Sequence, residues 1–492
     1  MTARRSRRPT PAILAFDVGT TETKAGLVGL DGTLLALARA GYRIDVEPAA
    51  GRAEQDPEDW WTALVTTSRA LASTPDAEVV AICVDGHGPT LVAVDAGGLP
   101  TRPAITWLDS RAAPEAAELT EATGLVGWAL GVLPAARWIE RHDAAASART
   151  RWYLNTWEAI ALRLTGRATT TIVAGGRPAD REALAAAGLE VSRLAPPAPA
   201  GEVVGALTAD AAAALGLRPG LPVVGGVVDA FASFHGAGLL APGDAIDVGG
   251  GAGGFGVYWD DPVAAAGSFC TPAPLPGMYV VGGAMAATGK ALDWFRDSVI
   301  GGATTTATLL EEAAAVPAGA AGVVFLPYLA GERAPLWDPA ARGAFVGLRL
   351  DHGRGHLARA ILEAAALAIR HVAESILDAG VRVTAMRLAG GPARSVVWNQ
   401  LKADVTGFPV EVPHVVETAV VGSAVLAAVG IGAYADLPAA IRGMTRVDVR
   451  LEPRPEAGAT YDALYRTYRE LHPAIASALD GRRRAATRGG AE

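Results

Sequence analysis

The amino-acid sequence predicts an α/β protein that is built twice over, as two lobes with a cleft between them. Two stretches about half a chain apart are near-copies of each other, Leu14–Thr21 and Ala245–Gly251. Each is a short apolar strand that ends in an aspartate and runs into a turn of small residues. Apolar residues resume after both turns, so each stretch is expected to form a β-hairpin. Because small residues leave backbone amides uncovered, both turns are also candidate phosphate-binding loops.

The composition indicates a soluble enzyme with more than one domain. The chain of 492 residues is longer than one hydrophobic core usually supports. A net charge of −8 and a pI near 5.6 argue against nucleic-acid binding. Charged residues interrupt every alanine-rich run, so no membrane segment is expected. The two cysteines, Cys83 and Cys270, exclude a disulfide framework and a zinc cluster, and a cytoplasmic location is the simplest expectation.

The first half is predicted to begin with strands and to continue as mixed α/β structure. Asp31–Gly32 is a turn signal between the second and third strands. An acidic first turn and Pro57 predict that a helix begins there and continues to Ala72. The other expected strands cover 12–18, 24–30, 33–40, 78–84, 90–95 and 222–226, and the other expected helices cover 112–122, 134–141, 155–164, 180–188, 208–216 and 228–238.

The second half is predicted to repeat this plan. A hairpin is expected at 245–258, further strands at 278–282 and 384–388, and helices at 288–299, 355–378, 394–406 and 419–430. The predicted division is a flexible arm at 1–11, an N-terminal lobe at 12–241, a C-terminal lobe at 242–475 and a flexible tail at 476–492.

Two other nucleotide-binding motifs are nearly matched in the second half. Gly249, Gly251 and Gly254 fit G-x-G-x-x-G, but strand-forming residues follow where that fingerprint needs a helix. Gly289–Lys290 resembles a Walker loop, but alanine stands where that loop needs its first glycine and its Ser or Thr. Glycines on both sides of Gly251 favour a backbone of positive φ there, which threonine would strain.

Asp229 is the candidate catalytic base. It follows a buried strand and two glycines, at the predicted start of a helix. A carboxylate at such a turn can accept a proton from a substrate hydroxyl. The same position suits a helix N-cap, and the sequence leaves both readings open.

Taken together, the motifs resemble those of the FGGY carbohydrate kinases, the family of glycerol kinase, xylulokinase and ribulokinase. The resemblance runs from about Ile13 to about Leu471. It is carried by Phe16–Thr21, Glu54–Trp61, Ala104–Arg111, Gly226–Gly238, Leu326–Pro335 and Gly390–Val405. It implies the two-lobed actin/hexokinase-like (ribonuclease H-like) ATPase fold. It also implies an ATP-dependent kinase that phosphorylates a primary hydroxyl of a ketose, such as xylulose or ribulose, or of a polyol.

The resemblance also implies residue roles, with ATP and Mg²⁺ as cofactors and a small sugar or polyol as partner. Asp229 matches the family's catalytic base and would also contact the substrate. The other implied substrate-binding residues are His87, Trp107, Asp109 and Arg111. The implied nucleotide-binding residues are Asp17 (which would also hold the metal through water), Gly19, Thr20, Thr21, Lys24, Gly249, Gly250, Gly251, Gly253, Gly289, Gly390, Gly391 and Asn399. No nucleic-acid or membrane partner is expected, and the oligomeric state stays open, with a homodimer among the options.

Several departures from the family pattern concern phosphate and substrate contacts. The second loop has glycines and Ala252 where the family usually has a hydroxyl residue. Gly88–Pro89 replace the Met-His pair of xylulokinases, and Ala230 replaces the asparagine after the base. We therefore expect a weak or altered preference for D-xylulose. Two other functions stay open: a non-catalytic actin-like ATPase, which would need no sugar pocket, and a degenerate sugar-binding regulator, favoured only by the all-glycine loop.

Overall fold

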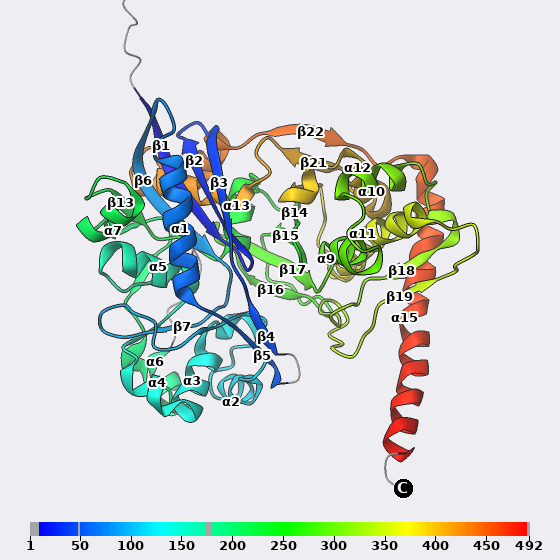
Figure 1. Cartoon of the computed structure of the whole chain (residues 1–492), viewed down its shortest axis with the longest axis horizontal. Helices are drawn as coiled ribbons and strands as arrows, with labels where there is room; N and C mark the ends of the chain where they lie inside the picture. Colours follow the sequence, from blue (N-terminus) through cyan, green and yellow to red (C-terminus); the bar gives the residue numbers. More distant parts are fainter. Residues whose placement is uncertain (1–8, 48–49, 174–179, 490–492) are drawn as a thin grey trace, which may run out of the picture. The chain divides into compact units, whose positions relative to one another are not determined.

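The computed structural model describes residues 9–47, 50–173 and 180–489, which form two compact units (Figure 1). The first unit contains Met1–Gly238, Pro272–Gly277 and Glu417–Arg446. The second contains Leu239–Thr271, Met278–Val416 and Val447–Glu492. The chain therefore returns to the first unit after most of the second is complete. The arm predicted at 1–11 lies mostly outside the described residues.

A six-stranded sheet of order β12-β13-β6-β1-β2-β3 forms the centre of the first unit. Strand β1 pairs antiparallel with β2, as the hairpin prediction requires, and parallel with β6. The strands of this sheet are β1 (Thr10–Val18), β2 (Glu22–Gly29), β3 (Leu34–Gly41), β6 (Ala77–Gly86), β12 (Val203–Ala206) and β13 (Pro222–Val224).

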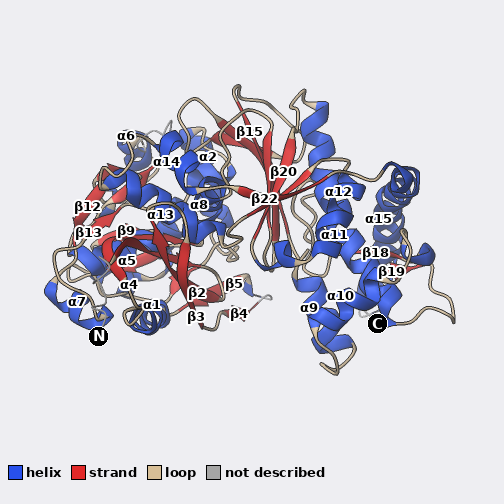
Figure 2. Cartoon of the chain, turned by 90° about the horizontal axis from the view of Figure 1, so that it is seen from above, coloured by secondary structure: helices blue, strands red, loops and turns tan. Residues whose placement is uncertain are grey.

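Helices cover both faces of this sheet. Helix α1 (Pro57–Leu71) starts at the N-cap Asp56 and packs against β2 and β3. Helices α8 (Asp229–Gly236) and α13 (Thr418–Gly430) lie on the other face (Figure 2). They approach closely, because a Cβ added at Gly236 would lie 1.8 Å from the Thr418 carbonyl oxygen. The remaining elements of the unit are β4 (Asp45–Glu47), β5 (Arg52–Gln55), β7 (Val92–Val94), β8 (Ala104–Ile105), α2 (Ala113–Thr123), α3 (Leu133–His142), α4 (Ala144–Arg149), β9 (Trp152–Leu154), α5 (Thr156–Thr165), β10 (Thr170–Ile172), α6 (Arg181–Ala186), β11 (Pro197–Pro199), α7 (Ala209–Leu215) and α14 (Leu437–Met444).

The second unit is built around a seven-stranded sheet of order β16-β17-β15-β14-β20-β21-β22. Figure 2 shows α11 and α12 beside this sheet. The strands are β14 (Asp244–Val248), β15 (Gly253–Trp259), β16 (Phe269–Pro272), β17 (Tyr279–Met285), β20 (Ala385–Ala389), β21 (Val410–Pro413) and β22 (Val447–Leu451). The other elements are α9 (Lys290–Trp294), α10 (Thr306–Ala314), β18 (Val324–Leu326), β19 (Ala344–Val346), α11 (Arg354–Asp378), α12 (Val396–Thr406) and α15 (Pro455–Gly489).

The two sheets repeat one plan, which confirms the predicted duplication. In the first unit a β1–β2 hairpin is followed by β6 and β13, both parallel to β1. In the second, the β14–β15 hairpin is followed by β20 and β21, both parallel to β14. Each hairpin gains a third antiparallel strand, β3 or β17. Each sheet also ends in an antiparallel strand, β12 or β22.

Two predicted elements differ in the structure. The helix expected over 288–299 ends at Trp294 and continues as a π-helical stretch over Phe295–Val299. Helix α15 continues to Gly489, so residues 476–489 are helical where a flexible tail was expected. Within the described part of the chain, no helix is long and apolar enough to cross a membrane.

Candidate active site

The backbone carbonyl groups of the turn between β1 and β2 accept hydrogen bonds from neighbouring residues. The Tyr42 hydroxyl donates to the Gly19 carbonyl at 2.5 Å, and its backbone amide donates to the Thr21 carbonyl at 3.0 Å. The Gln55 side-chain amide donates to the Thr20 carbonyl at 2.8 Å. The amides of Thr20 and Thr21 have no protein acceptor among the described residues. Uncovered amides of this kind bind anions, so the geometry fits a phosphate group.

Two aspartates share one face of the first sheet. Asp17 and Asp85 are register partners on the parallel strands β1 and β6, and register partners on such strands point to the same face. Asp17 forms an ion pair with Lys24 at 3.0 Å. Asp85 is fully buried, and one carboxylate oxygen accepts from the Ser423 hydroxyl of α13 at 2.6 Å. Burial, with Asp17 and Asp229 nearby, raises the pKa of Asp85 well above its usual range.

Asp229 is the first residue of α8 and not its N-cap, which is Val228. The N-cap alternative is therefore wrong. One Asp229 carboxylate oxygen accepts from the Ala230 amide at 2.7 Å. Removal from water and the negative charge of Asp17 raise the pKa of Asp229 to about 7, whereas Lys24 acts in the opposite direction. A carboxyl group with such a pKa is matched to proton transfer at neutral pH.

His87 and Trp107 lie on a connected part of the first unit. His87 is 1% exposed, and its ring stands edge-on to Trp60 with centroids 5.3 Å apart. Burial lowers the pKa of His87 to about 3, so the imidazole is neutral at physiological pH. The Trp107 indole N–H donates to the Thr20 hydroxyl at 3.0 Å. The structure thus brings a predicted sugar-pocket residue into contact with the first candidate phosphate-binding loop.

Asp109 and Arg111 are bound to each other. The Arg111 guanidinium donates to both Asp109 carboxylate oxygens, the shortest contact being 2.6 Å, and it also pairs with Glu54 at 2.8 Å. Asp109 accepts a further bond from the Ala53 amide at 2.7 Å. These contacts hold the segment after β8 against β5. Asp109 and Arg111 therefore have a structural role in addition to the predicted substrate contact.

The second loop is packed closely against neighbouring backbone. A Cβ added at Gly249 would lie 2.5 Å from the Ala389 carbonyl, and one at Gly289 would lie 1.8 Å from the Gly250 carbonyl. At Gly253 it would lie 2.3 Å from the Thr288 hydroxyl. Glycine is required at Gly249 and Gly289, because a Cβ there would collide with backbone, whereas at Gly253 it would collide with side-chain atoms.

Gly250 and Gly251 differ from the other glycines of this loop. A Cβ at Gly250 would make an ordinary contact of 3.5 Å, and one at Gly251 would meet only the flexible Lys290 side chain, at 2.8 Å. None of the glycines from 249 to 254, all within the described residues, has a positive φ. The expectation of a positive φ at Gly251 is therefore wrong.

The other predicted nucleotide residues of the second unit surround the end of β20. Gly390 has a φ of +73°, and a Cβ there would lie 2.4 Å from the Gly249 carbonyl. Nothing lies within 4 Å of a Cβ built at Gly391. Asn399 is buried and donates to the Ala393 carbonyl at 2.7 Å, which secures the turn after Gly391.

Asp247, at the end of β14, has the place in the second sheet that Asp17 has in the first. It forms a buried ion pair with Lys402 of α12 at 2.5 Å. The Lys402 side chain is 4% exposed and the Asp247 side chain 5% exposed. This pair is therefore more deeply buried than Asp17–Lys24, where the lysine side chain is 23% exposed.

Several contacting residues were missed by the sequence analysis. Tyr42 and Gln55 support the first loop, and Asp85 with Ser423 lies beside Asp17 and Asp229. The sequence did carry one signal, because Asp85 ends a buried strand as Asp17 does. Tyr42 and Ser423 have no comparable local signal. Gln55 lies in the Glu54–Trp61 segment that carries the family resemblance, but its contact with the first loop was not predicted.

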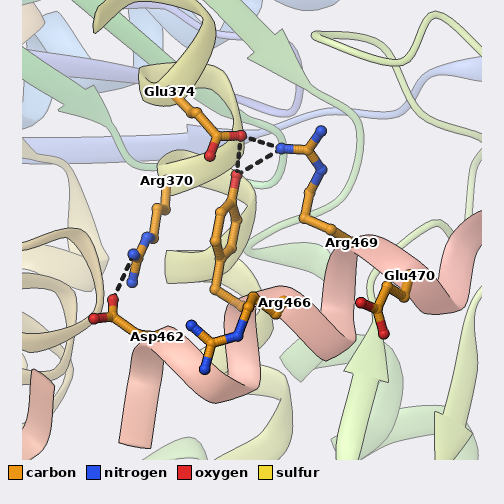
Figure 3. A pocket seen from close by; sticks show the side chains of 7 residues that line it. Arg370, Glu374, Asp462, Arg466, Arg469 and Glu470 are labelled. Carbon is orange, nitrogen blue, oxygen red and sulfur yellow. Dashed lines mark hydrogen bonds and ion pairs between the residues drawn. The ribbon is translucent and has the colours of Figure 1, made fainter. Parts of the chain in front are cut away.

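A surface pocket of about 400 Å³ lies between α11 and α15 of the second unit (Figure 3). Arg370 binds Asp462 at 2.6 Å, and Arg469 and Tyr465 both donate to Glu374. None of the predicted site residues lines it. Its arginines and carboxylates are equal in number, so the pocket is not a site of strong charge.

Comparison with known proteins identifies two family domains that follow one another along the chain. Residues 12–236 match the N-terminal domain, and residues 248–431 the C-terminal domain, of the FGGY family of carbohydrate kinases. The chain is 29% identical over 447 residues to a gluconokinase of Bacillus subtilis (strain 168), covering 85% of this chain and 87% of that protein. It is 31% identical over 421 residues to a xylulose kinase of Escherichia coli (strain K12), covering 80% and 84%.

Solved structures give the same result. The crystal structure of xylulose kinase from Rhodospirillum rubrum is similar with a TM-score of 0.77 and 35% identity, covering 94% of this chain and 99% of that one. The predicted actin/hexokinase-like fold is confirmed.

Proposed function

We propose that this chain, which belongs to the FGGY family of carbohydrate kinases, phosphorylates a primary hydroxyl of a ketose or a polyol. It is an ATP-dependent sugar kinase and binds a small sugar as substrate. The observation that carries the finer proposal is the environment of Asp229. Its pKa of about 7 lets the carboxylate be ionised at neutral pH and still accept a proton.

In the proposed reaction, Asp229 takes the proton from the attacking hydroxyl as the bond to phosphorus forms. The Ala230 amide donates to one Asp229 oxygen at 2.7 Å, which orients the carboxylate and leaves the other oxygen for the hydroxyl. General-base help of this kind contributes roughly 10²–10⁴ in rate.

Phosphate binding is assigned to the two glycine-containing loops. In the first unit we assign the amides of Thr20 and Thr21, with Gly19, Lys24 and Asp17. In the second unit we assign Gly249, Gly250, Gly251, Gly253, Gly289, Gly390, Gly391 and Asn399. Asp17 fits a hydrated Mg²⁺, because its carboxylate lies at the end of β1, directly before the uncovered amides. When bound, Mg²⁺ would neutralise charge on the phosphate oxygens.

Replacing Asp229 tests the assignment of the base. Asp229→Asn should leave ADP affinity unchanged in calorimetry and lower turnover by roughly 10²–10⁴. Asp210→Asn, at an exposed aspartate in the first turn of α7, is the matched control and should retain full turnover. A loss of less than about tenfold in a single-turnover measurement would show that another group accepts the proton.

The acceptor range tests the substrate class. Gly88–Pro89 stand where xylulokinases have a Met-His pair, and Ala230 stands where they have asparagine. The predicted pocket segments therefore lack the histidine and asparagine side chains. We expect D-xylulose to be a poorer substrate than at least one other pentulose, hexulose or polyol, measured as kcat/KM in a coupled ADP-release assay. A clear preference for D-xylulose over the whole panel would contradict this expectation.

A further inference from the structure

Four residues of the first unit form a continuous hydrogen-bonded path. The Thr90 hydroxyl lies 3.0 Å from Nδ1 of His87. The backbone amide of Trp107 donates to the same hydroxyl at 3.3 Å, and the Trp107 indole N–H donates to the Thr20 hydroxyl at 3.0 Å. The path therefore joins a residue just after β6 to the phosphate loop just after β1.

The direction of each hydrogen bond follows from the chemistry of the groups. Both nitrogens of Trp107 carry hydrogen and only donate. Thr90 is fully buried, and the only acceptor described for its hydroxyl proton is Nδ1 of His87. Nδ1 must therefore accept. His87 is neutral, since burial lowers its pKa to about 3. Its single ring proton is then on Nε2, which has no partner among the described residues.

Both ends of the path consequently present a hydrogen-bond donor. At one end is the Nε2–H of His87. At the other is the hydroxyl of Thr20, whose oxygen accepts from Trp107 and whose proton is left for another acceptor. The edge-on contact with Trp60 limits rotation of the His87 ring.

We propose that Thr90 is a positioning residue that fixes His87 as the Nε2–H tautomer and, through Trp107, orients the Thr20 hydroxyl on the phosphate loop. His87 then offers only a donor, so it selects a hydroxyl or carbonyl oxygen of the sugar. Thr20 offers its proton to a phosphate oxygen. This inference rests on the proposed function, because it assumes an oxygen-rich acceptor and a phosphate donor.

The tautomer can be measured without any enzyme assay. In ¹⁵N-histidine-labelled protein, a long-range ¹H–¹⁵N correlation spectrum shows which nitrogen of each imidazole carries the proton. The His87 signals are assigned as those lost in His87→Gln. We expect Nε2 to be protonated, and we expect Thr90→Val to lose this fixed pattern. A proton on Nδ1 in the unaltered protein overturns the proposal.

Kinetics of a matched pair of variants test the positioning role. Thr90→Val keeps the shape of the side chain but removes the hydroxyl, whereas Thr90→Ser keeps the hydroxyl. The valine variant should raise the acceptor KM about tenfold or more with a smaller change in kcat, as one lost hydrogen bond allows. The serine variant should stay within roughly threefold of the unaltered enzyme. Equal losses in both variants, or none in the valine variant, overturn the proposal.

These outcomes separate two kinds of failure. If the unaltered protein phosphorylates no sugar or polyol, the proposed function is wrong, and the NMR result still decides the tautomer. If it does phosphorylate an acceptor but the acceptor KM is insensitive to Thr90→Val, the function stands and the role of Thr90 is wrong.

Discussion

The two hairpin loops occupy equivalent places in the duplicated sheets but are held in different ways. In the first loop, side chains of Tyr42 and Gln55 bind the carbonyls, and the loop itself keeps two threonines. In the second, close backbone contacts at Gly249 and Gly289 fix the loop, and no loop side chain takes part. The conformation of the first loop is therefore held by polar side chains of neighbouring residues, and that of the second by close backbone packing that only glycine allows.

The aspartates that precede the two loops, Asp17 and Asp247, differ in how deeply their lysine partners are buried. Lys24, the partner of Asp17, comes from the adjacent strand and remains partly exposed. Lys402, the partner of Asp247, comes from α12 and is buried. We infer that the first pair is adapted to meet ligand charge, whereas the second pair mainly holds β14 and α12 together.

The largest expected effect separates the two aspartates. Asp247→Asn leaves the buried Lys402 ammonium without its partner, so the free energy of unfolding should fall by about 3–5 kcal/mol. Asp17→Asn should change stability far less, because Lys24 reaches water, but it should lower turnover. Denaturant unfolding and turnover measured on both variants check the contrast. Similar stability losses would show that the two pairs serve the same purpose.

A second prediction concerns the backbone contacts of the glycine loop. Gly289→Ala places a Cβ against the Gly250 carbonyl, and backbone cannot move aside cheaply. ADP affinity in calorimetry should fall by roughly a hundredfold, about 2.7 kcal/mol. Gly458→Ala, in α15 with nothing within 4 Å of its Cβ, is the matched control and should bind ADP normally. Unchanged ADP binding by the first variant would contradict the backbone-fixed loop.

A third prediction uses the exposed lysine. The positive charge of Lys24 lowers the pKa of Asp229, so Lys24→Met should raise that pKa above about 7. Because the proposed base Asp229 must be ionised, the acid limb of kcat/KM against pH should move upward, by about 0.5–1 unit. Lys290→Met, in the second unit, should leave the limb in place. An unchanged acid limb, or a downward shift, in the Lys24 variant would mean that the Lys24 charge does not lower the pKa of Asp229.

The smallest effect is expected at Gly251. Its φ is not positive, and an added Cβ displaces only the flexible end of Lys290. Gly251→Thr should therefore bind ADP within roughly threefold of the unaltered protein, since a surface-like substitution costs about 0.5 kcal/mol or less. A large loss of ADP affinity in calorimetry would show that the loop is more tightly constrained than its neighbours indicate.

Local patterns were enough to predict much of the fold but not the contacts between distant residues. The hairpins, α1 and the long helix α11 follow from apolar periodicity, caps and turn residues within a few positions. The Lys402–Asp247 pair joins residues 155 positions apart, and Ser423–Asp85 joins residues 338 apart. No local signal specifies such a partner. Likewise, the run of glycines around Gly251 could not show which of them face backbone and which face open space.

The return of Glu417–Arg446 to the first unit has a consequence for how the protein is made. Helix α13 packs against α8 and against β1 and β6, so one face of the first sheet lacks its α13 cover until residue 430 has left the ribosome. Domains generally fold as units during synthesis, the N-terminal one first. Here the N-terminal unit cannot complete its fold until most of the second unit has been translated, because α13 and the Ser423 partner of Asp85 are still missing.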